Sequence, residues 1–348
     1  MKKMYYNNYI CQKLGKIENL KIKKNKSREL KKNEVRLKVL AIGLNYVDTL
    51  MIKGDYQYKN ELPFVPGTEA CGIIIDENCN DKKLLNRKAI IFSKSGCFSE
   101  ETIINVSQLV LLEKKFSSLD GASFFSSALT AYVTLLEKAK IKKNNFILVT
   151  GASGGVGQAC VKLALHLKAK VICIVSNKKK AALLKELGVE KITFINNDIK
   201  KEVMEFTSNK GADIIIDING LLKEKNILGS LSWNGKYLIV GFTDNNISTI
   251  KTNYILIKSI QILGVRAGEF LRRCSITKKK NIIKDIFSLY TKGVFKVEKY
   301  SVKPFNKLIY ELTKIRDRKS IGKIIIKTKY LDNISYGQST FNVCRRPG

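Results

Sequence analysis

The chain of 348 residues has few of the side chains that build metal centres or disulfide frameworks. It contains one histidine, His166, and eight cysteines at irregular spacings, none of which forms a C-x-x-C pair. A catalytic zinc ion usually takes three protein ligands rich in His and Cys, and a structural zinc ribbon needs closely spaced pairs. We therefore expect neither a metal site nor a disulfide framework, and scattered, reduced cysteines are typical of a cytoplasmic protein.

Long apolar segments are also missing. No run of about 18 apolar residues occurs, so no transmembrane helix is expected, and residues 1–16 lack the apolar centre of a secretory signal. Hydrophobic residues make up 45% of the chain and charged residues 27%, which excludes a mainly disordered protein. The length predicts about two domains.

Acidic residues are scarce beside basic ones. The chain has 63 Lys and Arg against 30 Asp and Glu, a formal net charge of +33. Such a charge suits a nucleic-acid or anionic membrane partner. The lysines are scattered over the whole length, however, among many Asn and Ile residues, which is the composition that an AT-rich genome encodes. We therefore expect no membrane partner and favour composition over a nucleic-acid partner, and an RNA-binding role stays open as an alternative.

The first part of the chain reads as β-rich. Polar and apolar residues alternate around Val35, Leu37 and Val39, as in half-buried antiparallel strands. Beyond residue 120 the pattern changes to helical segments, and from residue 146 short apolar strands alternate with helices. The strands expected there are 146–150, 171–175, 192–195, 213–217, 237–242 and 259–265, and the helices are 158–168, 178–187, 199–208 and 221–231. This alternation predicts a doubly wound parallel sheet covered on both faces, an α/β fold.

A glycine loop joins the first of these strands to the first helix. The segment reads VTGASGGVGQACVKLALHL, with glycines at 151, 154, 155 and 157. Glycines let the backbone turn sharply and approach a pyrophosphate, and the helix N-terminus then offers free N–H groups to the phosphates. The strand–loop–helix context favours dinucleotide binding over a purely structural turn.

The end of the second strand indicates which dinucleotide binds. Enzymes that use NAD usually place Asp or Glu there for the ribose 2′-hydroxyl. This chain has no acid at that point and instead carries Ser176 and Lys180, which suit a 2′-phosphate. We therefore expect NADPH as the cofactor.

Several motifs in order along residues 5–327 resemble one family. They are N-x-x-D at Asn45 and Asp48, G-x-Y at Gly54 and Tyr56, LPFVPGTEACG at 62–72, LTAY at 129–132, GASGGVG at 151–157, VGF at 240–242, NYILIKSIQILGV at 253–265 and DRKSIGKIII at 317–326. Together they resemble the medium-chain dehydrogenase/reductase superfamily, in its zinc-free quinone oxidoreductase (zeta-crystallin-like) branch. Zinc members carry G-H-E where this chain has G-T-E at 67–69, and they carry a four-cysteine lobe that is missing here.

The resemblance implies a two-domain subunit with the active site in the cleft. Residues 1–128 would begin a GroES-like catalytic domain, 129–266 would form the Rossmann domain, 267–327 would return to the catalytic domain, and 328–348 would be a polar, loosely ordered tail. Many members are homodimers joined through the edges of their Rossmann sheets, and the apolar segment 259–265 is the expected edge. Members transfer hydride from NADPH to a quinone or a related α,β-unsaturated carbonyl, and the alternative within the same fold is a 2-enoyl thioester reductase.

The resemblance also assigns residue roles. Asn45 would lie near the nicotinamide and the substrate, Asp48 would orient that loop, and Tyr56 would line the substrate site, where its hydroxyl can stabilise a developing oxyanion or donate the proton. Glu69 is expected to make a structural hydrogen bond. The cofactor-binding positions are Asn45, Thr130, Gly154, Gly155, Val156, Ser176, Lys180, Asn197, Asn219, Phe242, Val265 and Arg318. Asn197 is a departure, because relatives commonly place a tyrosine there.

Overall fold

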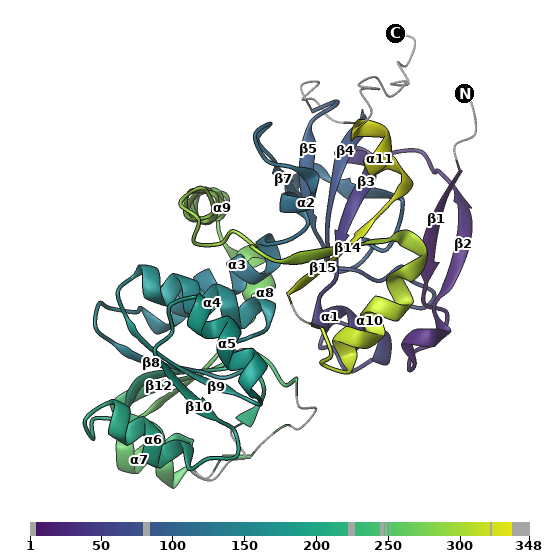
Figure 1. The fold of residues 1–348 in the computed structure, drawn as a ribbon. Helices are drawn as coiled ribbons and strands as arrows, with labels where there is room; N and C mark the ends of the chain where they lie inside the picture. Colours follow the sequence, from purple (N-terminus) through teal and green to yellow (C-terminus); the bar gives the residue numbers. More distant parts are fainter. Residues whose placement is uncertain are drawn as a thin grey trace. The chain divides into compact units, whose positions relative to one another are not determined.

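The computed structural model describes residues 5–78, 84–221, 227–243, 247, 249–250, 252–320 and 322–335. The chain divides into two compact units, of which the first combines Met1–Phe125 with Val297–Gly348 and the second is Ser126–Lys296 (Figure 1). The second boundary differs from the expected return to the catalytic domain at residue 267, because residues 267–296 group with the second unit. Two contacts illustrate this grouping: the Tyr132 hydroxyl donates to Asp285 over 2.7 Å, and Lys278 pairs with Glu137 over 2.8 Å.

The first unit is built on β-sheet, as its alternating sequence predicts. Its strands are β1 (Tyr5–Ile10), β2 (Lys21–Lys26), β3 (Glu34–Gly43), β4 (Glu69–Asn78), β5 (Lys88–Phe92), β6 (Glu101–Asn105), β7 (Leu109–Leu111), β14 (Tyr300–Pro304) and β15 (Lys323–Lys327). Its helices are η1 (Ile17–Asn19), α1 (Tyr46–Lys53), η2 (Val106–Gln108), α2 (Ser118–Gly121), η6 (Phe305–Lys307), α10 (Leu308–Arg316) and α11 (Lys329–Ser335). Among the described residues β1 pairs with β2, and the larger sheet runs β14-β15-β3-β4-β5-β7, with β6 also on β3.

Strand β3 is the centre of this sheet. One edge pairs with β4, and the other is shared between β6 at residues 34–38 and β15 at residues 41–43. Val35, Leu37 and Val39 are fully buried as expected, and Leu40, Ala41 and Ile42 are also buried, around a register irregularity between Val39 and Ala41. The expected alternation of buried and exposed residues is therefore wrong for residues 39–43 of β3, all of which are buried, whereas Glu34 and Lys38 are partly exposed.

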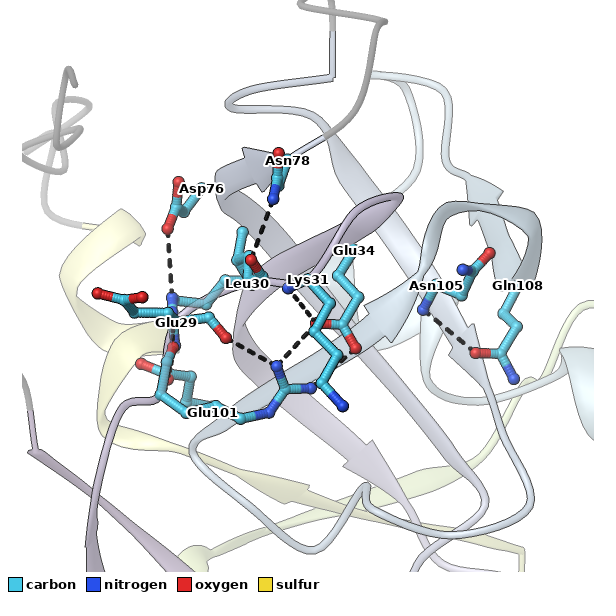
Figure 2. Close-up of polar contacts among 11 residues, drawn as sticks. Glu29, Leu30, Lys31, Glu34, Asp76, Asn78, Glu101, Asn105 and Gln108 are labelled. Carbon is cyan, nitrogen blue, oxygen red and sulfur yellow. Dashed lines mark hydrogen bonds and ion pairs between the residues drawn. The ribbon is translucent and has the colours of Figure 1, made fainter. Parts of the chain in front are cut away.

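One charged residue of β3 lies inside this packing and is held by ion pairs. Arg36 is 4% exposed and pairs with Glu101 over 2.6 Å and with Asp76 over 3.6 Å. Figure 2 labels Asp76 and Glu101 among the polar residues of this region. Ser27 donates a further hydrogen bond to Glu101 over 2.6 Å. Buried charges of opposite sign satisfy one another in this way, which is why a basic residue is tolerated within the central strand.

The second unit contains a sheet in which every pairing is parallel. Its strands are β8 (Phe146–Val149), β9 (Lys170–Val175), β10 (Lys191–Phe194), β11 (Ala212–Asp217), β12 (Leu231–Ile239) and β13 (Gln261–Gly264), in the order β10-β9-β8-β11-β12-β13. Its helices are α3 (Phe125–Tyr132, beginning at the boundary), η3 (Val133–Ala139), α4 (Gly155–His166), α5 (Lys178–Glu186), α6 (Ile199–Phe206), η5 (Leu228–Ser230), α7 (Asn253–Lys258), α8 (Ala267–Arg273) and α9 (Ile276–Thr291).

This order is that of a doubly wound dinucleotide fold, so the predicted parallel sheet is confirmed. The order of strands reverses at β8, which puts the loop after β8 at the switch point where such folds bind ligands. One expected helix differs: of residues 221–231, 222–226 lie outside the described residues and Leu228–Ser230 form a 3₁₀ turn.

The beginning of the polar tail is ordered, which corrects the expectation of a loose segment. Residues 329–335 form α11, and this helix contacts β3. The Thr328 hydroxyl donates to the carbonyl of Val39 over 2.6 Å, and Lys329 pairs with Glu100 over 2.8 Å. The side chains that bind this segment are polar, which explains why no apolar face marked it in the sequence.

Candidate functional site

In the first unit the candidate site begins where β3 turns into α1. Gly43 ends β3. A Cβ there would lie 2.0 Å from the carbonyl oxygen of Ala122, so a residue with a side chain does not fit at this position. Asn45 is the N-cap of α1, and its backbone N–H donates to the Asp48 carboxylate over 2.8 Å. This bond satisfies an N–H group at the start of the helix and fixes the turn.

Three neighbouring strands bring charged and polar side chains together at this turn. Glu69 opens β4, Lys323 opens β15, and Asn45 follows the end of β3, which lies between them in the sheet. The Lys323 ammonium donates to Asn45 Oδ1 over 2.8 Å and to Glu69 Oε2 over 2.7 Å. The expected structural hydrogen bond of Glu69 is therefore present, and Asn45 Nδ2 also donates to Glu69 Oε2, over 3.1 Å.

Burial makes these contacts strong. Glu69 and Asp48 are completely buried, Lys323 is 8% exposed, and Asn45 is partly exposed. Charges held away from water need partners, and here each charged group has them. Sequence analysis gave Lys323 no role. The available signal was the lysine that begins the strand KIIIK, directly before three isoleucines.

Asp48 is the site's most perturbed carboxyl group. Complete burial raises its pKa from 3.8 to about 7, against the opposing effects of the bonds from the Asn45 N–H and the Thr68 hydroxyl and of the Lys323 charge. The Thr68 hydroxyl lies 2.8 Å from Asp48 Oδ1. These contacts agree with the expected orienting role of Asp48, because both of its oxygens bind the protein.

Tyr56 lies three residues beyond the end of α1. Gly54 closes the helix with φ of 89°, and the partly buried Tyr56 ring packs against the core of the first unit. No contact joins the Tyr56 hydroxyl to the Asn45 turn among those that the structure gives, so the role of Tyr56 in the substrate site stays a prediction.

In the second unit the glycine loop joins β8 to α4 as the sequence predicts. A Cβ on Gly157 would lie 2.2 Å from the carbonyl oxygen of Gly151, so glycine is required there by the loop itself. Gly154 and Gly155 are exposed at the beginning of α4, beside the partly exposed Val156. The first turn of a helix has N–H groups without intrahelical partners, which suits a phosphate.

A buried carboxylate holds the loops around this glycine turn. Asp217, at the end of β11, accepts hydrogen bonds from the Thr150 hydroxyl over 2.7 Å and from the Tyr237 hydroxyl. It also accepts from the backbone N–H groups of Asn219 and Gly220 over 3.1 and 3.0 Å. Sequence analysis missed Asp217, although an acid that closes an apolar strand at its carboxyl end was a usable signal.

Contacts of three further expected cofactor positions, Asn219, Ser176 and Lys180, are present in the second unit. Asn219 lies against the glycine loop, since a Cβ on Gly151 would be 2.5 Å from its Oδ1. At the end of β9, the Lys180 ammonium donates to the Ser176 hydroxyl over 3.1 Å, so the two predicted 2′-phosphate groups are adjacent. Asn177 caps α5 by accepting from the Lys180 N–H over 3.0 Å.

The remaining expected positions are scattered over other elements. Asn197 donates to Glu202 of α6, the Thr130 hydroxyl donates to the Ser126 carbonyl over 2.9 Å, and Val265 is 8% exposed after β13. Phe242 is partly buried beyond β12. Arg318 belongs to the first unit, in the turn after α10. The cofactor contacts assigned to these residues stay predictions.

Metal centres and membrane spans concern other kinds of site in the described part of the chain. Neither a group of three or more His, Cys, Asp and Glu side chains that could hold a metal ion nor a helix long and apolar enough to span a membrane occurs among the described residues.

The raised pKa of Asp48 predicts how stability depends on pH. The folded carboxyl keeps its proton up to about pH 7, whereas the unfolded chain releases it near pH 3.8. Asp48 therefore stabilises the fold below about pH 4, and this contribution is lost as the pH rises to about 7. We expect the free energy of unfolding of the wild type, relative to Asp48→Asn, to fall over that range and to level above it. Urea denaturation of both proteins from about pH 4 to about pH 8 measures this difference, and a difference that does not change with pH would contradict the assignment.

Known proteins resemble both units. A family model described as alcohol dehydrogenase GroES-like domain matches residues 31–114, and one described as zinc-binding dehydrogenase matches residues 155–279. The quinone oxidoreductase-like protein 2 homolog of Nematostella vectensis is 30% identical over 331 residues, which cover 93% of this chain and 89% of that protein. The quinone oxidoreductase-like protein 2 of Rattus norvegicus is 26% identical over 339 residues, which cover 93% of each chain.

Solved structures show the same fold. A quinone oxidoreductase of Pseudomonas syringae pv. Tomato DC3000 superposes with a TM-score of 0.85 at 22% identity and covers 92% of this chain and 99% of its own. A mycobacterial protein solved in complex with NADPH gives the same values. With a relative at 30% identity that is matched over most of its length, and both domain models found in order, the chain belongs to the medium-chain dehydrogenase/reductase family of oxidoreductases.

Proposed function

We propose that this oxidoreductase is an NADPH:quinone reductase, which transfers hydride to a quinone or a related α,β-unsaturated carbonyl without a metal ion. The observation that carries the proposal is that the same unit has both an exposed glycine turn at the start of α4 and the Ser176 and Lys180 side chains, which contact each other. The names of the relatives and the NADPH complex of a structural neighbour agree with it.

The residues of the second unit fit NADPH. The glycine turn offers N–H groups to a pyrophosphate, and a Cβ on Gly154 would meet the Gly151 carbonyl oxygen at 3.5 Å, so the fold itself leaves space there. Lys180 and Ser176 would bind the 2′-phosphate by charge-assisted hydrogen bonds. NADPH supplies the hydride when bound, and the protein supplies binding and orientation.

The first unit contributes the polar groups proposed for the reacting centre. Asn45 would contact the nicotinamide or the substrate, and Asp48 would hold the Asn45 turn through its backbone. Tyr56 would place its hydroxyl on the substrate carbonyl, where it stabilises negative charge and donates a proton, directly or through water.

The exposed side chains beside β13 support a homodimer. Strand β13 is paired with β12 on one side among the described residues, and α7, which leads into it, exposes Leu256 and Ile257 by 82% and 64%. An unpaired parallel edge with apolar neighbours suits a symmetric contact between two copies.

Sedimentation of the purified protein tests the dimer. We expect the wild type to sediment as a dimer and Leu256→Asp as a monomer, because the carboxylate would be buried in the contact. Ile276→Asp is the matched control, since Ile276 is equally apolar, 75% exposed and on α9. A monomeric wild type would contradict the dimer.

Turnover measurements test the reaction and the cofactor together. We expect faster oxidation of NADPH than of NADH with 1,4-benzoquinone or 9,10-phenanthrenequinone, and Lys180→Ala should lower this preference about tenfold by removing a charged hydrogen bond. Lys185→Ala, an exposed lysine on the same helix, should not change it. Turnover with an enoyl thioester alone would make the protein a 2-enoyl thioester reductase. NADPH binding without any turnover would favour the RNA-binding alternative. A measurement of how RNA binding depends on salt would then test that alternative.

Gly154→Ala tests whether this glycine is required for NADPH binding and not for the stability of the fold. Because the new methyl group fits beside Gly151, we expect an unchanged melting temperature. The methyl group would stand where the pyrophosphate approaches, so the dissociation constant of NADPH should rise about tenfold or more. Unchanged NADPH binding, measured by fluorescence titration, would remove the pyrophosphate from this loop.

A further inference from the structure

The Asn45 side-chain amide has one orientation that its neighbours allow. Its oxygen faces the Lys323 ammonium at 2.8 Å, and its nitrogen faces the Gly43 carbonyl oxygen at 3.2 Å and Glu69 Oε2 at 3.1 Å. Turned by 180°, the amide would put its oxygen against two acceptors and its NH₂ group against an ammonium. Three neighbours therefore agree on the same orientation.

This orientation limits what Asn45 can offer a ligand. An amide nitrogen carries two hydrogens, and here both are donated to the protein, to Gly43 and to Glu69. The backbone N–H of Asn45 is donated to Asp48. Asn45 thus meets a ligand with its oxygen, as an acceptor.

We propose that Lys323 is a positioning residue that fixes Asn45 as a hydrogen-bond acceptor, so that the ligand group that Asn45 recognises is a donor, such as a hydroxyl or an amide N–H. The inference rests on the proposed function, in which Asn45 touches the cofactor or the substrate. It also excludes Asn45 as the donor that stabilises a developing oxyanion, and leaves that task to Tyr56 or water.

Lys323 is the neighbour that binds the amide oxygen. Gly43 and Glu69 both accept, so they attract the NH₂ group, but only the ammonium holds the oxygen on the opposite side. Asn45 is partly exposed while Lys323 and Glu69 are buried, so the buried pair acts on a ligand through Asn45. The competing explanation is that Lys323 merely neutralises Glu69, which would be a structural role.

A pair of variants separates the two explanations. Lys323→Met leaves a buried carboxylate without its cation, and we expect it to lose both stability and kcat/KM. Adding Glu69→Gln removes that carboxylate charge. We expect the double variant to regain stability while its kcat/KM stays about 10- to 100-fold below that of the wild type, the effect of losing one hydrogen bond to a charged group. Lys327→Met, on the same strand but with a side chain 37% exposed and paired with Asp332, is the control and should match the wild type.

Recovery of kcat/KM together with stability in the double variant would overturn the proposal, because Lys323 would then act only through the fold. Urea denaturation gives the stability of each protein, and NADPH oxidation with a quinone gives kcat and KM separately.

A second readout does not depend on turnover. The side-chain NH₂ signals of Asn45 in an NMR spectrum can be assigned by their loss in Asn45→Asp. We expect slow hydrogen exchange of these protons in the wild type and in Lys327→Met, and faster exchange in Lys323→Met/Glu69→Gln, where the Gly43 carbonyl is the one partner of the three that is unchanged. Equal exchange in all three proteins would overturn the positioning role. A wild type that shows slow exchange but no reductase activity would refute the proposed function and leave the orientation of Asn45 intact.

Discussion

The burial of an ammonium and a carboxylate at the end of three adjacent strands is the constraint on which the first unit's site depends. Lys323 and Glu69 are 2.7 Å apart and nearly inaccessible to water. A buried ion pair is stable only when its remaining hydrogen-bonding capacity is satisfied. Asn45 supplies both an acceptor and a donor to this pair, so the orientation of its side chain is set by these two buried charges.

In the second unit one buried carboxylate holds the loops at the end of a strand. Asp217 is 1% exposed, and it gathers two hydroxyl groups and two backbone N–H groups at the carboxyl end of β11. These bonds hold the loop that carries Asn219 against Gly151. In both units a buried acid therefore orders the backbone at an asparagine proposed to touch the cofactor, Asp48 at Asn45 and Asp217 at Asn219.

The sequence pattern predicted the parallel sheet and the glycine turn, because both depend on residues that are close in the chain. The parallel sheet follows from apolar strands alternating with helices, and the glycine turn follows from a spacing confined to seven residues, 151–157. Lys323 could not be assigned in this way, because its partners lie 254 and 278 residues away in the chain. The burial of every residue from 39 to 43 of β3 was also missed, because the register irregularity between Val39 and Ala41 arises in the pairing with β4 and interrupts the local alternation. The helix α11 was missed because polar rather than apolar contacts attach it.

The two carboxyl groups near Asn45 have separate effects on it. Asp48 binds the Asn45 backbone N–H and thereby sets where α1 begins, whereas Glu69 and Lys323 bind the side-chain amide. A change in the protonation of Asp48 alters the strength of the bond to the backbone, and it also acts on Lys323 and Glu69, whose charges in turn shift the pKa of Asp48. Because the pKa of Asp48 is about 7, the stability of the turn responds to pH near neutrality, while the acceptor character of Asn45 is held by a pair whose opposite charges favour one another. The site thus couples a titrating group that positions the helix to an ion pair that orients the Asn45 amide.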